Sequence, residues 1–145
     1  MEIDTGHVAD RIRSDHAGLL EKIETHADAV AADWADETVA DPEAITTPLR
    51  RRLADAGLLA SLPEILETAA SAADLDLPAE PVPAPPYVVV TSHGPVLRAT
   101  VDTGRLVVRV AVFDLRRPST GAPPQYGRSQ KGAPLTVEWV PSQHH

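Results

Sequence analysis

Hydrophobic positions near the start of the chain recur with the period of an amphipathic helix. At 100° per residue, ten side chains fall on one face: Val8, Ile12, His16, Leu19, Leu20, Ile23, His26, Ala27, Val30 and Trp34. Polar residues occupy the opposite face, so the pattern predicts one long helix, about 50 Å in length, that packs on one side. We expect Asp41-Pro42 to end this helix.

Two shorter helices are predicted to follow. Thr47-Pro48 has the form of an N-cap followed by proline at the first helical position, and Gly57 has the form of a C-terminal cap. The capping box Ser61-x-x-Glu64 then predicts a helix that ends near Leu75. Residues 1–76 are therefore expected to form an antiparallel helical unit of one long and two shorter helices.

The predicted long helix has an apolar stripe that extends to Trp34 at its far end. Residues 47–75 are too few to cover a stripe of that length. The pattern therefore favours self-association through the long helix, and we expect a homodimer.

A proline-rich segment, residues 77–86, separates the helical region from the rest of the chain. Proline at this density excludes helix and favours an extended linker. Beyond it the hydrophobic period changes to two, which predicts strands at residues 87–91, 96–101, 106–115 and 135–140. Residues 87–145 are therefore expected to form an antiparallel β meander of three or four strands, and the fold class is α+β.

The turn near Thr103-Gly104 sets the register of the central hairpin. A two-residue turn at this dipeptide pairs Leu97 with Val110 and places the apolar side chains on one face. Arg98 and Arg109 then lie together on the opposite face. Because Thr-Gly is a poor type I′ turn, a type I turn with a glycine bulge is the alternative, and it would mix the two faces.

A long segment, residues 116–134, shows no periodicity and contains many glycines and prolines. Long irregular segments in compact domains are usually functional or disordered, so we predict a basic loop that binds a partner. The candidate partner-binding residues are those of this loop and of the basic sheet face: Arg98, Arg109, Arg116, Arg117, Tyr126, Arg128 and Lys131.

Charge divides the chain in the same place as the hydrophobic period. The protein has 145 residues, 21 acids, 13 bases and a net charge of −8, and eleven of the bases are arginine. Residues 1–80 carry a net charge of −12 and residues 81–145 a net charge of +4. Either the two parts attract each other within one fold, or the basic part meets an anionic partner.

Two sources explain an acidic, lysine-poor and alanine-rich composition: a halophile with a cytosol of molar salt, or a mesophile with a GC-rich genome. We favour the halophile. The residues Tyr87 to Thr100 and Gly104 to Arg109 resemble small uncharacterised proteins of halophilic archaea. The resemblance covers the β region and implies this origin, but it implies no activity.

Candidate catalytic chemistry is sparse. The chain has no cysteine, which excludes disulfides and thiolate catalysis. His16 and His26 would lie about 15 Å apart along a helix, too far to share a metal ion. His93 follows Ser92 in a predicted turn, where adjacent residues seldom form a nucleophile and base. The pair His144-His145 predicts no site, and neither a metal nor a cofactor is expected.

Residues 47–75 also fit a helix-turn-helix, but residues 61–75 contain three acids and no base, which would repel phosphate. The sequence therefore predicts a non-enzymatic binding or regulatory module with a possible protein partner. The alternatives are a nucleic-acid-associated protein that uses the basic sheet face and loop, and a small metal-dependent or hydrolytic enzyme. No run approaches the roughly 18 apolar residues of a membrane span, so we expect a cytoplasmic protein without a membrane partner.

Overall fold

The computed structural model describes residues 2–117, 121–129 and 135–142. Within these residues four helices come first: α1 (Thr5–Asp15), α2 (Ala17–Ala32), α3 (Glu43–Asp55) and α4 (Leu58–Ala72). Six strands follow in the described part of the chain: β1 (Val88–Val90), β2 (Pro95–Val101), β3 (Gly104–Val110), β4 (Phe113–Arg116), β5 (Gln125–Arg128) and β6 (Leu135–Pro141). All the strand pairs are antiparallel, so the α+β class is confirmed.

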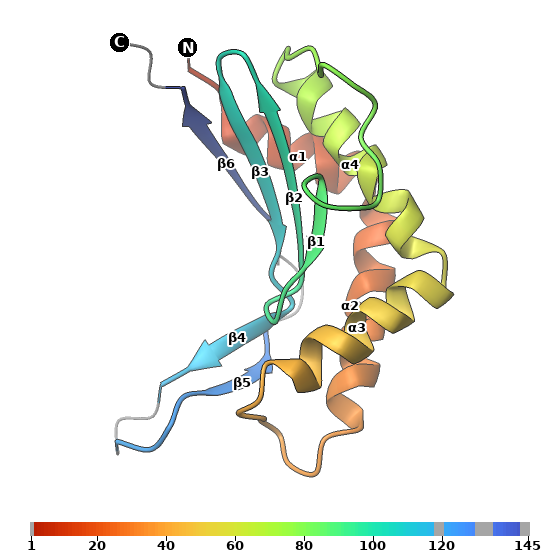
Figure 1. Cartoon of the computed structure of the whole chain (residues 1–145), viewed down its shortest axis with the longest axis vertical. Helices are drawn as coiled ribbons and strands as arrows, with labels where there is room; N and C mark the ends of the chain where they lie inside the picture. The colour runs from red at the N-terminus through yellow and green to blue at the C-terminus, as the bar shows by residue number, and fades with distance from the viewer. Residues whose placement is uncertain (1, 118–120, 130–134, 143–145) are drawn as a thin grey trace.

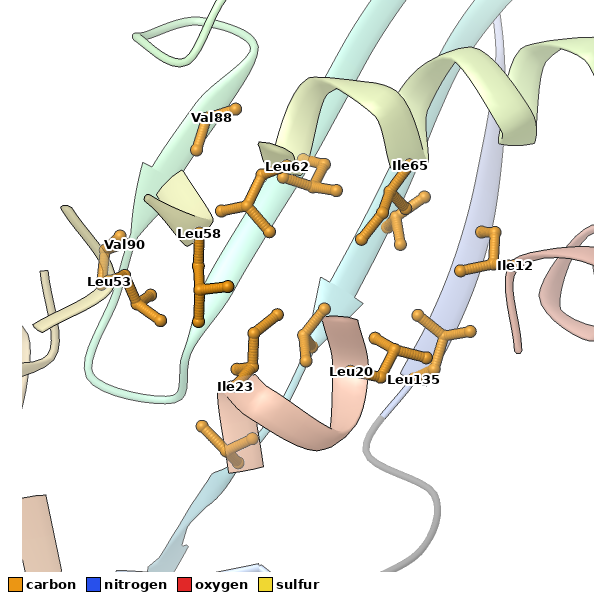
Figure 2. Packing of buried hydrophobic residues seen from close by; sticks show 14 of the residues in the cluster. Ile12, Leu20, Ile23, Leu53, Leu58, Leu62, Ile65, Val88, Val90 and Leu135 are labelled. Carbon is orange, nitrogen blue, oxygen red and sulfur yellow. The ribbon is translucent and has the colours of Figure 1, made fainter. Parts of the chain in front are cut away.

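The strands form two sheets. The main sheet has the order β1-β2-β3-β6, and β4 and β5 form a separate hairpin. The helices lie along one side of the main sheet, with α1 against β6, α4 against β2 and α3 against β1 (Figure 1). One hydrophobic core between the two layers contains residues of all four helices and of both sheets. Figure 2 shows this interface, where side chains such as Ile12, Ile23 and Leu62 gather with Val88 and Leu135 of the sheet.

The predicted long helix is two helices. The chain breaks at His16, whose φ of −126° and ψ of 26° are not helical. α1 packs against α4 and β6 whereas α2 packs against α3 and β5, and one straight helix could not reach both sets of partners. His16 Nε2 lies 2.7 Å from Thr68 Oγ1 of α4, which ties the junction to the core. The stripe nevertheless faces inward on both sides of the break: Val8, Ile12, Leu20, Ile23, Ala27 and Val30 are buried.

The far end of this stripe is covered by the chain itself. The ring centroid of Trp34 lies 5.6 Å from that of Phe113 in β4. The β4–β5 hairpin therefore occupies the place that we had expected a second subunit to cover. This packing gives no support to a homodimer formed through an uncovered helical stripe.

The start of α3 differs from the prediction. The Asp41 carboxylate accepts a hydrogen bond from the Glu43 N–H at 2.9 Å, so Asp41-Pro42 begins a helix instead of ending one. Pro48 lies inside α3. The earlier start is favoured because it adds Ile45, which is fully buried, to the apolar face.

Gly57 has the expected left-handed conformation, with a φ of 76°, and it separates α3 from α4. α4 begins directly after it, so Ser61 lies inside the helix and not at its N-cap. The Ser61 hydroxyl donates to the Gly57 carbonyl at 3.4 Å. The predicted capping box is therefore wrong, although the buried face that includes Leu62 and Ile65 is as expected.

The register between β2 and β3 differs from the prediction by two. The turn residues are Asp102 and Thr103, and Leu97 pairs with Val108 instead of Val110. A shift of two preserves the faces, because strand side chains alternate with a period of two. Gly104 lies in the strand, where a Cβ atom would come within 2.6 Å of the Trp139 ring. Close packing, and not the turn, requires glycine at this position.

The long irregular loop predicted at residues 116–134 is also wrong in part. Its residues Gln125–Arg128 form β5, which pairs with β4, and the predicted strand 106–115 is divided between β3 and β4. The sequence Gln-Tyr-Gly-Arg lacks the apolar alternation that identifies a strand. In the part of the chain that the structure describes, no helix has the length and hydropathy needed to cross a membrane.

Candidate functional site

The predicted partner-binding residues separate into two groups. Arg98 of β2 and Arg109 of β3 lie on the main sheet, on the face that the helices leave uncovered. Arg116, Tyr126 and Arg128 lie on the β4–β5 hairpin, and Arg117 directly follows β4. Lys131, His144 and His145 lie outside the described residues.

Strand alternation determines which side chains point away from the helices. The outward positions of β2, β3 and β6 are Val96, Arg98, Thr100, Arg105, Val107, Arg109, Thr136, Glu138 and Val140. We call this surface the arginine face, after its exposed residues Arg98, Arg105 and Arg109. Sequence reasoning missed Arg105 because it assigned that residue to a turn. The signal was present, since Arg105 and Arg109 alternate with Leu106, Val108 and Val110, which are apolar and buried.

The arginine face is positively charged although the whole chain is acidic. Glu138 is the one carboxylate among the described outward residues of β2, β3 and β6. Its Oε1 lies 3.5 Å from Arg109 Nη2, and the two side chains are 49% and 46% exposed. A pair this exposed contributes little stability, so the Arg109 guanidinium remains accessible to another anion.

A hollow of about 430 Å³ lies at one end of the arginine face. Its lining comes from the β1–β2 turn and the end of β3: Thr91, His93, Gly94, Pro95, Val96, Arg109, Val110 and Ala111. The Thr91 N–H donates to the Gly94 carbonyl at 3.0 Å, and the Gly94 N–H donates to the Thr91 carbonyl at 3.1 Å. The Val112 N–H donates to the His93 carbonyl at 2.8 Å, which fixes the turn against the chain that follows β3.

Gly94 allows the close approach that shapes this hollow. Its φ is 138°, a conformation that side chains with a Cβ rarely adopt. A Cβ atom at this position would lie 2.0 Å from the Val110 carbonyl oxygen. The turn can therefore lie against the end of β3 only with glycine at residue 94.

His93 and Ser92 have separate hydrogen-bond partners. His93 Nδ1 lies 3.0 Å from the Phe113 carbonyl oxygen, which can only accept, so Nδ1 carries the hydrogen. Its ring meets the Tyr126 ring edge-on at a centroid distance of 5.6 Å. The Ser92 hydroxyl lies 3.1 Å from the Tyr126 hydroxyl and not beside the imidazole. This arrangement gives no support to Ser92 as a nucleophile activated by His93.

Arg128 holds the hairpin against the acidic helices. Its Nε donates to Asp28 Oδ1 of α2 at 2.9 Å, and its Nη1 donates to the Val112 carbonyl. The guanidinium also lies over the Phe113 ring, 5.7 Å from the centroid. The Arg128 side chain is only 15% exposed, so it stabilises the contact between the hairpin and α2 and is not available to a partner.

The other hairpin residues are also engaged within the chain. Arg116 Nη2 donates to the Arg128 carbonyl at 2.7 Å, and its guanidinium covers Gly127. The Tyr126 N–H donates to the Val39 carbonyl at 2.7 Å, and the Val39 N–H donates to the Tyr126 carbonyl at 3.0 Å. Arg117 is exposed. Among the described cations of the predicted set, Arg128 is covered, Arg116 is exposed but bonded within the hairpin, and Arg98, Arg109 and Arg117 are exposed.

The helical histidines are not assembled into a recognisable centre. His16 is bonded to Thr68, and His26 has a buried Nδ1 without a hydrogen-bond partner. Within residues 2–117, 121–129 and 135–142, no three metal-ligating side chains lie together.

Residues 6–140 match the family model of DUF7988, a domain of unknown function. The match covers nearly the whole chain, so the protein belongs to this family. No curated protein and no solved structure matches the chain. The matched range includes the arginine face and the hollow beside it.

Proposed function

We propose that the protein is a non-enzymatic binding module that docks an acidic segment of a partner protein on its arginine face. One observation carries the proposal. The helices cover one side of the main sheet, and the other side presents Arg98, Arg105 and Arg109 with a single carboxylate among its described residues.

The chemistry of this face suits carboxylates. Guanidinium groups form forked, bidentate hydrogen bonds with carboxylates, which give both affinity and orientation. Arg105 and Arg109 are four residues apart on β3, a distance of about 13 Å along a strand. An extended partner with acids four residues apart would match this spacing. Val140, which pairs with Arg105 and is 45% exposed, adds apolar contact, which salt does not screen.

A nucleic acid is the second candidate partner. Sheets that bind single strands usually stack bases on exposed aromatic rings. The described outward positions of β2, β3 and β6 carry valine, threonine, arginine and glutamate and no aromatic residue. This composition favours a protein partner over a nucleic acid.

The test uses a fluorescent peptide, Ser-Asp-Val-Thr-Val-Asp-Ser, whose two aspartates are four residues apart. Anisotropy should show binding that is lost when both aspartates are replaced by asparagine. The triple variant Arg98→Gln, Arg105→Gln, Arg109→Gln should weaken binding at least about tenfold, as expected for the loss of charge-assisted bonds. A control variant removes the same charge elsewhere through Arg51→Gln, Arg52→Gln and Arg117→Gln, all exposed positions.

The control variant should bind within about twofold of the wild type, because surface charge away from the contact changes affinity little. Equal losses in both triple variants would show a general charge effect and reject the arginine face as the site. Tighter binding of a thymidine dodecamer than of the peptide would favour the nucleic-acid alternative.

We further propose that the protein works in the cytoplasm of a halophilic archaeon and forms a homodimer. The excess of acids and the preference for arginine over lysine support the origin. The edge strand β6 pairs with β3 alone among the described strands, and the part of its outer edge beyond Leu135, whose carbonyl accepts from Arg13, supports dimer formation. Light scattering in 2 M KCl should show a dimer, and the melting midpoint should fall in 0.1 M KCl as acids repel one another. A monomer would contradict the proposed homodimer, and equal melting midpoints at the two salt concentrations would contradict the halophilic origin.

A further inference from the structure

The hollow beside the arginine face has the features of a small-molecule site. Its volume of about 430 Å³ lies within the range of ligand pockets, roughly 300 to 1,000 Å³. Most of its lining is apolar, from Pro95, Val96, Val110 and Ala111. Such pockets typically combine an apolar wall with a few polar groups that fix the orientation of the ligand.

Arg109 determines the charge of a suitable ligand. It is the one charged residue, with histidine taken as neutral, among the eight that line the hollow. Its bond to Glu138 is long, at 3.5 Å, and half-exposed. A carboxylate entering from the hollow can approach the same guanidinium in bidentate geometry, which is stronger than an exposed monodentate pair.

The lining has two other polar side chains, Thr91 and His93, and they differ in what they can offer a ligand. The Thr91 hydroxyl is already engaged, since it donates to the Gly94 carbonyl at 2.9 Å and accepts from the His93 N–H at 3.2 Å. His93 uses Nδ1 for the Phe113 carbonyl, so Nε2 is the ring nitrogen left to meet a ligand. The lining thus offers one cation and one imidazole nitrogen at an apolar hollow.

We propose that this hollow binds a small monocarboxylic acid with a compact apolar body, whose carboxylate pairs with Arg109. The site is distinct in chemistry from the acidic-segment docking proposed above, and the two share Arg109 and Val96. Because Arg98 is absent from the lining of the hollow, variants at Arg98 and at Ala111 separate the two proposals.

The probe is 3-phenylpropanoate, and its neutral amide, 3-phenylpropanamide, is the matched ligand control. A titration followed by amide chemical shifts should place the largest changes at residues 91–94, 96 and 109–111. The dissociation constant should be on the order of 1 mM, as is typical for a ligand of this size. The amide should bind at least about fivefold more weakly, because it cannot form a charge-assisted pair.

Four variants test the assignment. Arg109→Gln should weaken the acid at least about fivefold and remove the preference over the amide. Ala111→Leu should weaken both ligands by filling the hollow while it keeps Arg109. Arg51→Gln, on an exposed position of α3, is the charge-matched control and should leave the acid affinity unchanged. Arg98→Gln should weaken the acidic peptide but not the acid.

Equal affinity for acid and amide would overturn the proposal, as would equal effects of Arg109→Gln and Arg51→Gln. Shift changes that map away from the hollow would also overturn it. A failure of the docking proposal would give a different result. The peptide would not bind, and the acid would still bind the wild type more tightly than it binds the Arg109→Gln variant.

Discussion

Arg109 and Arg128 lie in the same basic half of the sequence but in opposite environments. The Arg128 side chain is 15% exposed and is bonded to Asp28 of α2, whereas the Arg109 side chain is 46% exposed and faces away from the helices. Attraction within the fold therefore explains Arg128, whereas the exposed Arg109 is left for the anionic partner that we propose. The hairpin arginine joins the acidic and basic parts, and the sheet arginines leave a basic surface open.

The largest effect should come from the core beneath the hairpin. Phe113 is fully buried between Trp34 and Arg128, so Phe113→Ala should lower the free energy of unfolding by about 3 to 4 kcal/mol. Leu115→Ala, on the same strand but only half-buried, should cost about 1 kcal/mol. Denaturant titration followed by tryptophan fluorescence measures both. Equal costs would show that the hairpin is not anchored through Phe113.

An intermediate effect is expected at Arg128 itself. Arg128→Gln removes the bonds to Asp28 and to the Val112 carbonyl and should destabilise the fold by about 2 kcal/mol. Arg117→Gln removes an exposed charge nearby and should change stability by less than about 0.5 kcal/mol. Thermal melts of the two variants compare them directly. A melt of Arg128→Gln that coincides with that of Arg117→Gln would remove the distinction between the two arginine environments.

The smallest effect is expected on the arginine face. Glu138→Gln removes an exposed pair and should change stability by less than about 0.5 kcal/mol. It should raise the affinity for the diaspartate peptide about twofold, since a repulsive carboxylate is removed. Glu67→Gln, an exposed site on α4, provides the same charge change away from the face and should leave affinity unchanged. Weaker peptide binding by Glu138→Gln would contradict the proposed docking surface.

The sequence predicted the faces of the sheet better than its register. Arg98 and Arg109 lie on one outward face although each pairing differs by two from the expected one. Alternation has a period of two, so an error of two residues leaves every side chain on its correct face. The hollow could not be predicted, because it depends on the approach of the Gly94 turn to the Val110 carbonyl.

Tertiary contacts explain what the local pattern could not reveal. The break at His16 leaves the apolar stripe nearly in phase, so periodicity alone cannot detect it. β5 has no apolar alternation; it is held instead by backbone pairing of Tyr126 with Val39 and by the bond from Arg128 to Asp28 of α2. Those partners are about ninety to one hundred residues away in sequence, beyond the reach of local patterns.

The contacts between the ends of the chain determine when folding can be completed. Arg13 of α1 donates to the Leu135 carbonyl of β6 at 3.4 Å, so an early helix and a late strand complete each other. During synthesis the helices emerge first, and their apolar faces stay exposed to solvent until the strands that cover them have been synthesised. Pairing across such sequence distances is slow compared with helix formation. We therefore expect aggregation to be the greatest risk while the helices have been synthesised and the strands have not.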